Sequence, residues 1–428
     1  MKEELSDVER WQQDEDERLE YEGYCNKIRK GLEDLDEKSG ERALWELVQN
    51  ARDMSKEARI KIELTEDCII FSHHGMPFDY TSFRALVKQD SSKDRNGTDQ
   101  VGQYGTGFMT THAFNRKVYV SGPFVVKFGK DDIKGYVQVN NFELDRTDVD
   151  TEEGPKKMKK QLDDVKLFWK NKLSEEIIND TTSFRYELSS EQIGEISQQI
   201  SNAIRLMPFV LVINDRIREI EICNYHSKEH FTLKKTAERS HDALAKEGWC
   251  RVTEKILLTN HNAVGTPPTP YTCTSLQSNK GDVIIIPPFP KTSGDIYEIP
   301  SLFLWFPLLG TETFGVNFIF HSKRFYPVEK RNNIMLPGST IMKKEKGGLN
   351  NIVLKEMTEA LFGYYANDEN AKTLTRKMCE VSFPLLCEDE ETRNFYKEMQ
   401  LLWNTVIPDW KVLPIGPNHY AVSNPNIK

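Results

Sequence analysis

Two short stretches decide the fold of this chain. The first is Glu46-Leu47-Val48-Gln49-Asn50-Ala51-Arg52-Asp53, and the second is Gly102-Gln103-Tyr104-Gly105-Thr106-Gly107-Phe108. Apolar residues recur at three- and four-residue spacing through the first stretch, which predicts an amphipathic helix. These apolar positions are Leu44, Leu47, Val48 and Ala51.

The same helix carries a polar row. Glu46, Asn50 and Asp53 stand at positions i, i+4 and i+7, so they share a second face. Two carboxylates and an amide in this arrangement can activate water, hold a hydrated magnesium ion and contact a polar ligand. These eight residues alone, however, favour the solvated face of an ordinary amphipathic helix.

The glycines of the second stretch change that balance. Gly102, Gly105 and Gly107 let backbone N–H groups approach a ligand closely, and a turn ahead of a helix forms a nest for anions. A glycine run by itself is a weak signal, because flexible loops show the same pattern. The two stretches together, with predicted strands between them, are much more specific.

This combination resembles the GHKL, or Bergerat-fold, ATPases, which include DNA gyrase B subunits, the ninety-kilodalton heat-shock chaperone, histidine kinases and MutL. It is most similar to the sacsin-like branch of the heat-shock-chaperone-type ATPases. A His-Asn-Gly-x-Pro-Phe segment is typical of that branch, and His73-His74-Gly75-Met76-Pro77-Phe78 is similar to it. The resemblance implies ATP and Mg²⁺ as ligands.

The resemblance also implies roles for individual residues. Glu46 is the expected general base for the attacking water, and the amide oxygen of Asn50 is the expected Mg²⁺ ligand. Asp53 and Thr182 are expected on the base and ribose side, and Lys93 on a lid over the phosphates. The full set of expected nucleotide-binding residues is Asn50, Asp53, His73, Gly75, Lys93, Gly102, Tyr104, Gly105, Thr106, Gly107, Phe108 and Thr182.

One departure from the family pattern concerns the base. The usual Asp-x-Gly-x-Gly motif supplies an aspartate that accepts from the adenine amino group, whereas this chain has His73 there and Pro77 in place of the second glycine. A neutral histidine accepts one hydrogen bond, and Asp79 is expected nearby. Base specificity therefore stays open. A metal site at His73-His74 is disfavoured, because no other ligand is spaced with the pair.

A second resemblance lies in the segment from Pro307-Leu308-Leu309-Gly310-Thr311-Glu312 to Phe325-Tyr326-Pro327-Val328-Glu329-Lys330-Arg331-Asn332. It is similar to a sacsin-like pattern that starts with Pro-Leu-x-Gly-(Ser/Thr)-Glu and ends with Asn-Pro-Thr-Glu-x-Arg. Lys330 and Arg331 are therefore the expected phosphate sensors, with Lys323 third. Without the resemblance, a basic turn after a strand is more often plain surface.

Composition sets outer limits. The 428 residues suffice for two or three domains, with 38% hydrophobic and 29% charged residues. We expect a cytoplasmic protein, because the seven cysteines are scattered and neither a signal peptide nor an uninterrupted apolar run of membrane-spanning length is visible. The net charge of −9 argues against broad nucleic-acid binding.

The expected fold class is α+β. A Bergerat α/β sandwich, with helices on one face of a mixed sheet, precedes a transducer-like α/β domain and a helical C-terminal region. The expected divisions are an N-terminal helical arm at 1–38, an ATPase domain at 39–195, a middle domain at 196–335 and a mainly helical region at 336–428. The arm is expected to cross a dimer partner through Trp11 and Tyr24, or to be a partly disordered acidic segment.

Local signals complete the expected elements. Ser39 is the expected N-cap of the first helix, and a hairpin is expected from 59–64 and 68–71. Pro208 is expected to end a helix that starts at Ser190, with a strand to follow at 209–213. A short helix at 81–88 and a strand at 182–188 flank the glycine-rich region.

The leading functional hypothesis is an ATPase whose cycle gates homodimerisation and conformational change, in a chaperone-like or defence role with a client or partner protein. Glu46 favours hydrolysis over the phosphate donation of histidine kinases. The first alternative is a non-hydrolysing nucleotide sensor, which His73 and Pro77 favour. The second is a DNA-processing ATPase like MutL or a topoisomerase, which the net acidity disfavours.

Overall fold

The computed structural model describes residues 7–89, 107–129, 132–263, 265–287 and 299–407, together with the backbone of 411–416 and 419–422. The chain divides into two compact units, each assembled from three stretches of sequence. The first unit is Met1–Ala203, Arg216–Thr232 and Asn260–Thr266, and the second is Ile204–Asp215, Leu233–Thr259 and Pro267–Lys428. The expected boundaries at 38, 195 and 335 stay predictions.

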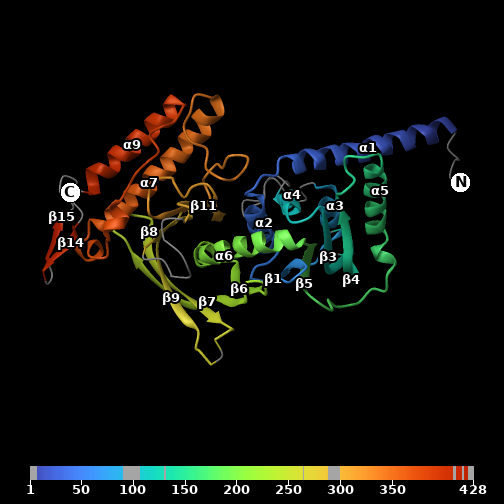
Figure 1. The fold of residues 1–428 in the computed structure, drawn as a ribbon, viewed down its shortest axis with the longest axis horizontal. Coiled ribbons are helices and arrows are strands. Elements are labelled where there is room, and N and C mark those ends of the chain that lie inside the picture. Colours follow the sequence, from blue (N-terminus) through green and yellow to red (C-terminus); the bar gives the residue numbers. More distant parts are fainter. Residues whose placement is uncertain are drawn as a thin grey trace. The chain divides into compact units, whose positions relative to one another are not determined.

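The first unit combines helices with one part of a mixed sheet (Figure 1). Its helices are α1 (Asp7–Glu33), α2 (Ser39–Asp53), α3 (Tyr80–Lys88), α4 (Gly107–Thr110), α5 (Glu153–Lys166) and the first part of α6 (Ser190–Ile213). Its strands are β1 (Ala58–Leu64), β2 (Cys68–His74), β3 (Lys117–Phe128), β4 (Asp132–Asp145), β5 (Thr181–Glu187), β6 (Ile217–Asn224) and the start of β7 (Glu229–Ala243). Short 3-10 turns occur at Thr111–Ala113 and Phe168–Lys170.

The strands of the first unit run in the order β7-β6-β1-β2-β5-β3-β4. β1 pairs in parallel with β6 and antiparallel with β2, so the sheet is mixed. Alternate side chains of β1 differ sharply: Ile60, Ile62 and Leu64 are buried, whereas Lys61 and Glu63 are partly exposed. One face of the sheet is therefore packed and the other is polar. The expected α+β class with a mixed sheet is confirmed.

Local sequence signals were largely reliable here. The predicted hairpin is β1 and β2, with Ile62 opposite Phe71, and the predicted short helix is α3. The cap of α2 was predicted wrongly. Lys38 occupies the N-cap, and Ser39 is the first helical residue, where its hydroxyl accepts from the Asp36 N–H at 2.8 Å. The hydroxyl is therefore used by the preceding turn.

The prediction for Pro208 was also wrong. α6 continues through this proline to Ile213, so 209–213 is helix and not strand. A proline inside a helix costs roughly 3 kcal/mol, because it lacks the N–H and crowds the preceding turn. Full burial of the residues around it offsets that cost. Met207, Phe209, Val210 and Leu211 are each 0% exposed.

α6 is the one helix in the described part of the chain whose length and composition would allow a membrane span. Of its apolar window, 78% is buried inside the structure, as in the core helix of a globular protein. The length and composition of an apolar helix therefore do not decide by themselves whether it packs inside the protein or crosses a membrane.

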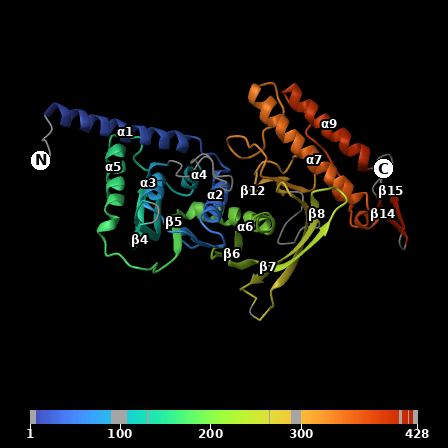
Figure 2. The same cartoon turned by 180° about the vertical axis from the view of Figure 1, so that it is seen from behind.

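The second unit places helices over a further part of the sheet (Figure 2). Its strands follow the order β7-β8-β9-β10-β13-β11-β12. They comprise β8 (Trp249–Asn260), β9 (Thr269–Ser278), β10 (Asp282–Ile286), β11 (Leu302–Leu304), β12 (Phe306–Pro307) and β13 (Ile319–Ser322). Its helices are a π-helical turn at Lys343–Gly347, α7 (Gly348–Tyr365), α8 (Asp368–Ala371), a 3-10 turn at Arg376–Cys379 and α9 (Glu390–Val406). A hairpin of β14 (Lys411–Gly416) and β15 (His419–Val422) follows α9. The expected helical C-terminal region is present.

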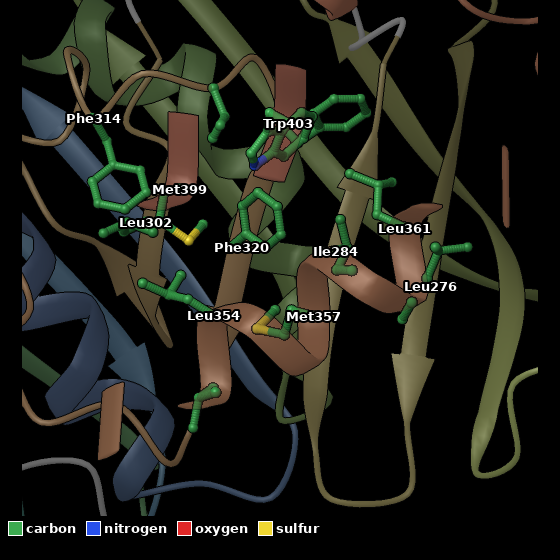
Figure 3. Close-up of a cluster of buried hydrophobic side chains, with 14 of the residues drawn as sticks. Leu276, Ile284, Leu302, Phe314, Phe320, Leu354, Met357, Leu361, Met399 and Trp403 are labelled. Atoms are coloured by element: carbon green, nitrogen blue, oxygen red, sulfur yellow. The ribbon is translucent and has the colours of Figure 1, made fainter. Parts of the chain in front are cut away.

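An apolar cluster holds these helices on the strands (Figure 3). Trp403 of α9 is fully buried, and its ring lies 5.9 Å from that of Phe318 and 5.0 Å from that of Phe362. Ile284 and Phe320 supply the strand side of the cluster. Trp403 is the most deeply buried of the four α9 residues in this cluster, beside Phe395, Tyr396 and Met399.

We predict that Trp403→Ala removes roughly 3–5 kcal/mol from the unfolding free energy of the second unit, because the cavity would be fully enclosed. Leu401→Ala is the matched control on the same helix, since Leu401 is 69% exposed, and it should change stability by less than about 0.5 kcal/mol. Urea denaturation followed by circular dichroism measures both. Equal effects would contradict the packing described here.

Candidate functional site

The polar row of α2 is fixed by burial of the rest of the helix. Leu47, Val48 and Ala51 are each 0% exposed. Glu46 and Asn50 are half-buried on another side of the helix, and Asp53 is buried at its end. Because the apolar residues cannot leave the core, the helix cannot rotate and the polar row keeps its direction.

The end of the glycine-rich stretch reaches this row. At Gly107, the first residue of α4, a Cβ atom would lie 2.1 Å from Glu46 Oε2 and 2.9 Å from its Cδ. Real Cβ atoms do not approach so closely, so a side chain at position 107 would force the Glu46 carboxylate to move. Phe108 anchors this contact, because its buried ring lies 5.3 Å from that of Phe184 on β5.

Two strands deliver the next group of predicted residues. His73 of β2 lies opposite Thr182 of β5 in antiparallel register, and both are almost fully buried. β2 ends at His74, and Gly75 is the next residue. The N–H of Met76 then donates to the carbonyl of Met54, the residue directly after α2, at 2.8 Å. The structure therefore brings the ends of α2, β2 and β5 together, with Asp53, His73, Gly75 and Thr182 at that end.

Gly122 is a site neighbour that the sequence reasoning missed. A Cβ at this position would lie 2.8 Å from Thr182 Oγ1, so the β3 backbone passes directly beside the threonine. The available signal was a glycine inside a strand pattern, which often marks a close approach of backbone.

His73 is neutral in this environment. Burial is the dominant cause and lowers the pKa of His73 to about 4. Its Nδ1 lies 3.4 Å from the His74 carbonyl oxygen, and its ring stacks near Phe184. A neutral imidazole has one acceptor nitrogen, which is the capacity that the missing aspartate would have supplied.

The two neighbouring aspartates have other partners. Asp53 Oδ1 accepts from Arg52 Nη1 at 3.0 Å, and both side chains are buried. Asp79, which was expected near the base, instead caps α3 by accepting from the Ser82 N–H at 2.7 Å. Its other oxygen lies 2.7 Å from Lys127 Nζ. Both carboxylate oxygens of Asp79 therefore have partners within the chain, and its expected position near the base stays a prediction.

The remaining predicted residues divide into two groups. Lys93, Gly102, Tyr104, Gly105 and Thr106 lie outside the described residues. Lys330 and Arg331 lie on a turn of the second unit, where the Arg331 N–H donates to the Val328 carbonyl at 2.9 Å and Arg331 has φ of 50°. Their predicted contact with phosphate stays a prediction.

We predict that His73→Gln reduces the pH dependence of stability. A lowered pKa in the folded state means that the unfolded chain binds the proton first, so stability falls as pH drops from 6.5 towards about 4. His73 should contribute a loss on the order of 2 kcal/mol between about pH 7 and about pH 4.5.

Denaturant titrations at both pH values measure this difference. Burial, with a smaller effect of Arg146, also lowers the pKa of His112 to about 3, so the comparison of wild type with variant is what isolates His73. An identical pH-dependent loss in the two proteins would contradict the assignment of a neutral buried His73.

Comparisons with known proteins found matches among solved structures alone. No family model matches the chain, and no curated protein matches it. Among solved structures, the B-subunit of the DNA gyrase from Myxococcus xanthus is similar with a TM-score of 0.28 and 8% sequence identity, over 55% of this chain and 67% of that one.

Proposed function

We propose that the first unit binds ATP with Mg²⁺ and hydrolyses it. The observation that carries this proposal is the contact between Gly107 and Glu46, which joins the two stretches singled out by the sequence. A carboxylate beside side-chain-free backbone is the arrangement needed to hold water against a phosphate. A solvated surface helix would have no need of such an approach.

Each residue of the proposed site has a separate role in ATP binding or hydrolysis. Glu46 orients the attacking water and accepts its proton, and Asn50, one turn away, presents an amide oxygen to the metal. Mg²⁺, when bound with ATP, supplies charge neutralisation at the phosphates. His73 and Thr182 line the side of the pocket where the base and ribose bind, with His73 as an acceptor. Lys93 offsets the developing negative charge, and the phosphate-sensing role expected for Lys330 and Arg331 stays a prediction.

The nucleotide cycle in this proposal gates homodimerisation, in the cytoplasm, of a chaperone-like or defence protein that acts on a partner protein. Helix α1 supports the dimer. Its second half is docked through buried residues, whereas its first half exposes apolar side chains. The exposed residues are Val8 at 64%, Trp11 at 64% and Leu19 at 52%. Tyr24 instead contacts its own chain, with Lys88 Nζ 4.3 Å from its ring centroid.

We predict that Glu46→Ala lowers Mg²⁺-dependent ATP turnover by about a hundredfold or more while ATP still binds. Gly107→Ala should lower turnover to a similar extent, because the new methyl group must displace the Glu46 carboxylate. Gly194→Ala is the matched control, since a Cβ there meets nothing within 4 Å. Phosphate release measures turnover, and calorimetry measures binding.

Each outcome separates the competing functions. Turnover that survives Glu46→Ala would refute Glu46 as the base. Binding without turnover in the wild-type chain would replace the ATPase with a nucleotide sensor. Absence of binding to any of the four nucleotides would refute the proposal, and binding to duplex DNA that weakens with salt would favour the DNA-processing alternative.

We predict that a non-hydrolysable ATP analogue shifts the wild-type chain from monomer to dimer, and that Trp11→Glu prevents the shift. A charge on the exposed half of α1 would have to be desolvated in the interface. Light scattering gives the mass, and Leu401→Glu, on an exposed face of α9, is the control. A wild-type chain that stays monomeric with the analogue bound would contradict the dimer.

A further inference from the structure

Three side chains of metal-binding type converge on the polar face of the first unit's sheet. Glu221 and Cys223 stand two residues apart on β6, so they point to the same face, and His230 stands on the neighbouring strand β7. One ligand atom from each lies within 4.8 Å of the other two. Within the described part of the chain, this is a compact carboxylate, thiol and imidazole set.

The separations of the ligand atoms suit a tetrahedral ion. His230 Nε2 lies 3.1 Å from Glu221 Oε1, and Cys223 Sγ lies 3.4 Å from the same oxygen. Zinc binds nitrogen and oxygen near 2.0–2.2 Å and sulfur near 2.3 Å, which places its ligand atoms roughly 3.3–3.6 Å from one another. These two separations therefore lie close to those of a zinc site, and the ligand atoms of Cys223 and His230 lie within 4.8 Å of one another.

The hairpin holds these ligands in place. β6 and β7 are joined by the short turn 225–228, where the Ser227 N–H donates to the Asn224 side chain at 3.1 Å. The ring of His261 lies 4.1 Å from that of His230, and the His261 N–H donates to the His230 carbonyl at 2.9 Å. Rigid ligand positions lower the cost of ordering a metal site.

The donor set also suits a divalent cation. Binding of such an ion would release the proton of the Cys223 thiol and leave two anionic ligands, the Cys223 thiolate and the Glu221 carboxylate, that balance its charge.

We propose that Glu221, Cys223 and His230 form a Zn²⁺ site on the polar face of the sheet. The ion has three protein ligands, and a water molecule completes its coordination on the solvent side, where the Glu221 and His230 side chains are 32% and 37% exposed. His261 is a positioning residue that supports the His230 ring. This site is independent of the nucleotide pocket, because the helices pack on the other face.

Lys61 provides a second test of the same geometry. Its ammonium lies 2.9 Å from Glu63 and 3.9 Å from Glu221, directly across the β1–β6 register from Glu221. A cation at this distance competes with a metal for the carboxylate. Lys61→Met should therefore strengthen zinc binding, whereas loss of a ligand weakens it.

The experiment is a titration of the full chain, reduced and without nucleotide, with ZnCl₂ by isothermal calorimetry. We expect one-to-one binding that Glu221→Gln, Cys223→Ser and His230→Gln each weaken by at least about tenfold. Cys250→Ser and His226→Gln are matched controls, since Cys250 lies in the second unit and His226 in the hairpin turn. The controls should bind zinc like the wild type.

Cobalt tests the thiolate without any substitution. Co²⁺ bound by Cys223 should give a thiolate-to-metal charge-transfer band in the near ultraviolet, which Zn²⁺ then removes. No one-to-one binding in the wild-type chain, binding unchanged in all three ligand variants, or Co²⁺ binding without this band would overturn the proposal. The three side chains would then be a hydrogen-bonded group that joins β6 to β7.

Discussion

The close approach of Gly107 to Glu46 is the constraint on which the candidate site of the first unit depends. A Cβ would overlap the carboxylate, so any residue other than glycine at this position would displace the end of the Glu46 side chain. Packing fixes the position of both helices. Leu47 and Val48 of α2 are buried, and Phe108 of α4 packs near Phe184 of β5. The contact therefore follows from two packed surfaces and not from the flexibility of a loop.

Polar residues also lie inside the well-packed first unit. His73 and Thr182 replace apolar side chains on the inward positions of β2 and β5, where Phe71 and Phe184 are their neighbours on the same face. Burial of an imidazole stabilises its neutral form, so the position loses little hydration energy near neutral pH. A charged aspartate there would need a hydrogen-bonding ligand or a cation to offset its desolvation.

The second unit is stabilised in a different way. Its cluster around Trp403 is apolar, but beside it Arg324 makes a two-point contact with Asp282, at 3.1 and 2.8 Å, and a further one with Glu356 at 2.7 Å. The nearly buried Asp282 needs such partners, since an isolated carboxylate would be costly there. These bonds tie β10 to α7 and fix the segment that precedes the basic turn at Lys330 and Arg331.

The two faces of one sheet separate the two proposed sites. Along β6, Ile220 and Ile222 point into the core, and Glu221 and Cys223 point the other way. The same alternation on β1 buries Ile60 and Ile62 and presents Lys61 and Glu63. The proposed nucleotide site and the proposed zinc site therefore lie on opposite faces of the sheet, because successive side chains of a strand alternate between its two faces.

The sequence by itself determined the elements whose signals are local. The spacing of Leu47, Val48 and Ala51 predicted α2, and alternation predicted the hairpin of β1 and β2. It could not determine outcomes that depend on distant partners. Pro208 stays helical because its neighbours are fully buried, and Asp79 caps α3.

The candidate site shows the same division. Glu46, Asn50 and the glycines could be selected from the sequence, because their spacing carries the pattern. Only the tertiary structure placed Gly107 against Glu46, put Gly122 beside Thr182 and made His73 a buried neutral imidazole. It also gathered Glu221, Cys223 and His230. The periodic pattern of a helix or strand is a property of residues that are close in sequence. The proximity and burial of side chains, in contrast, arise only when strands and helices far apart in the chain pack together.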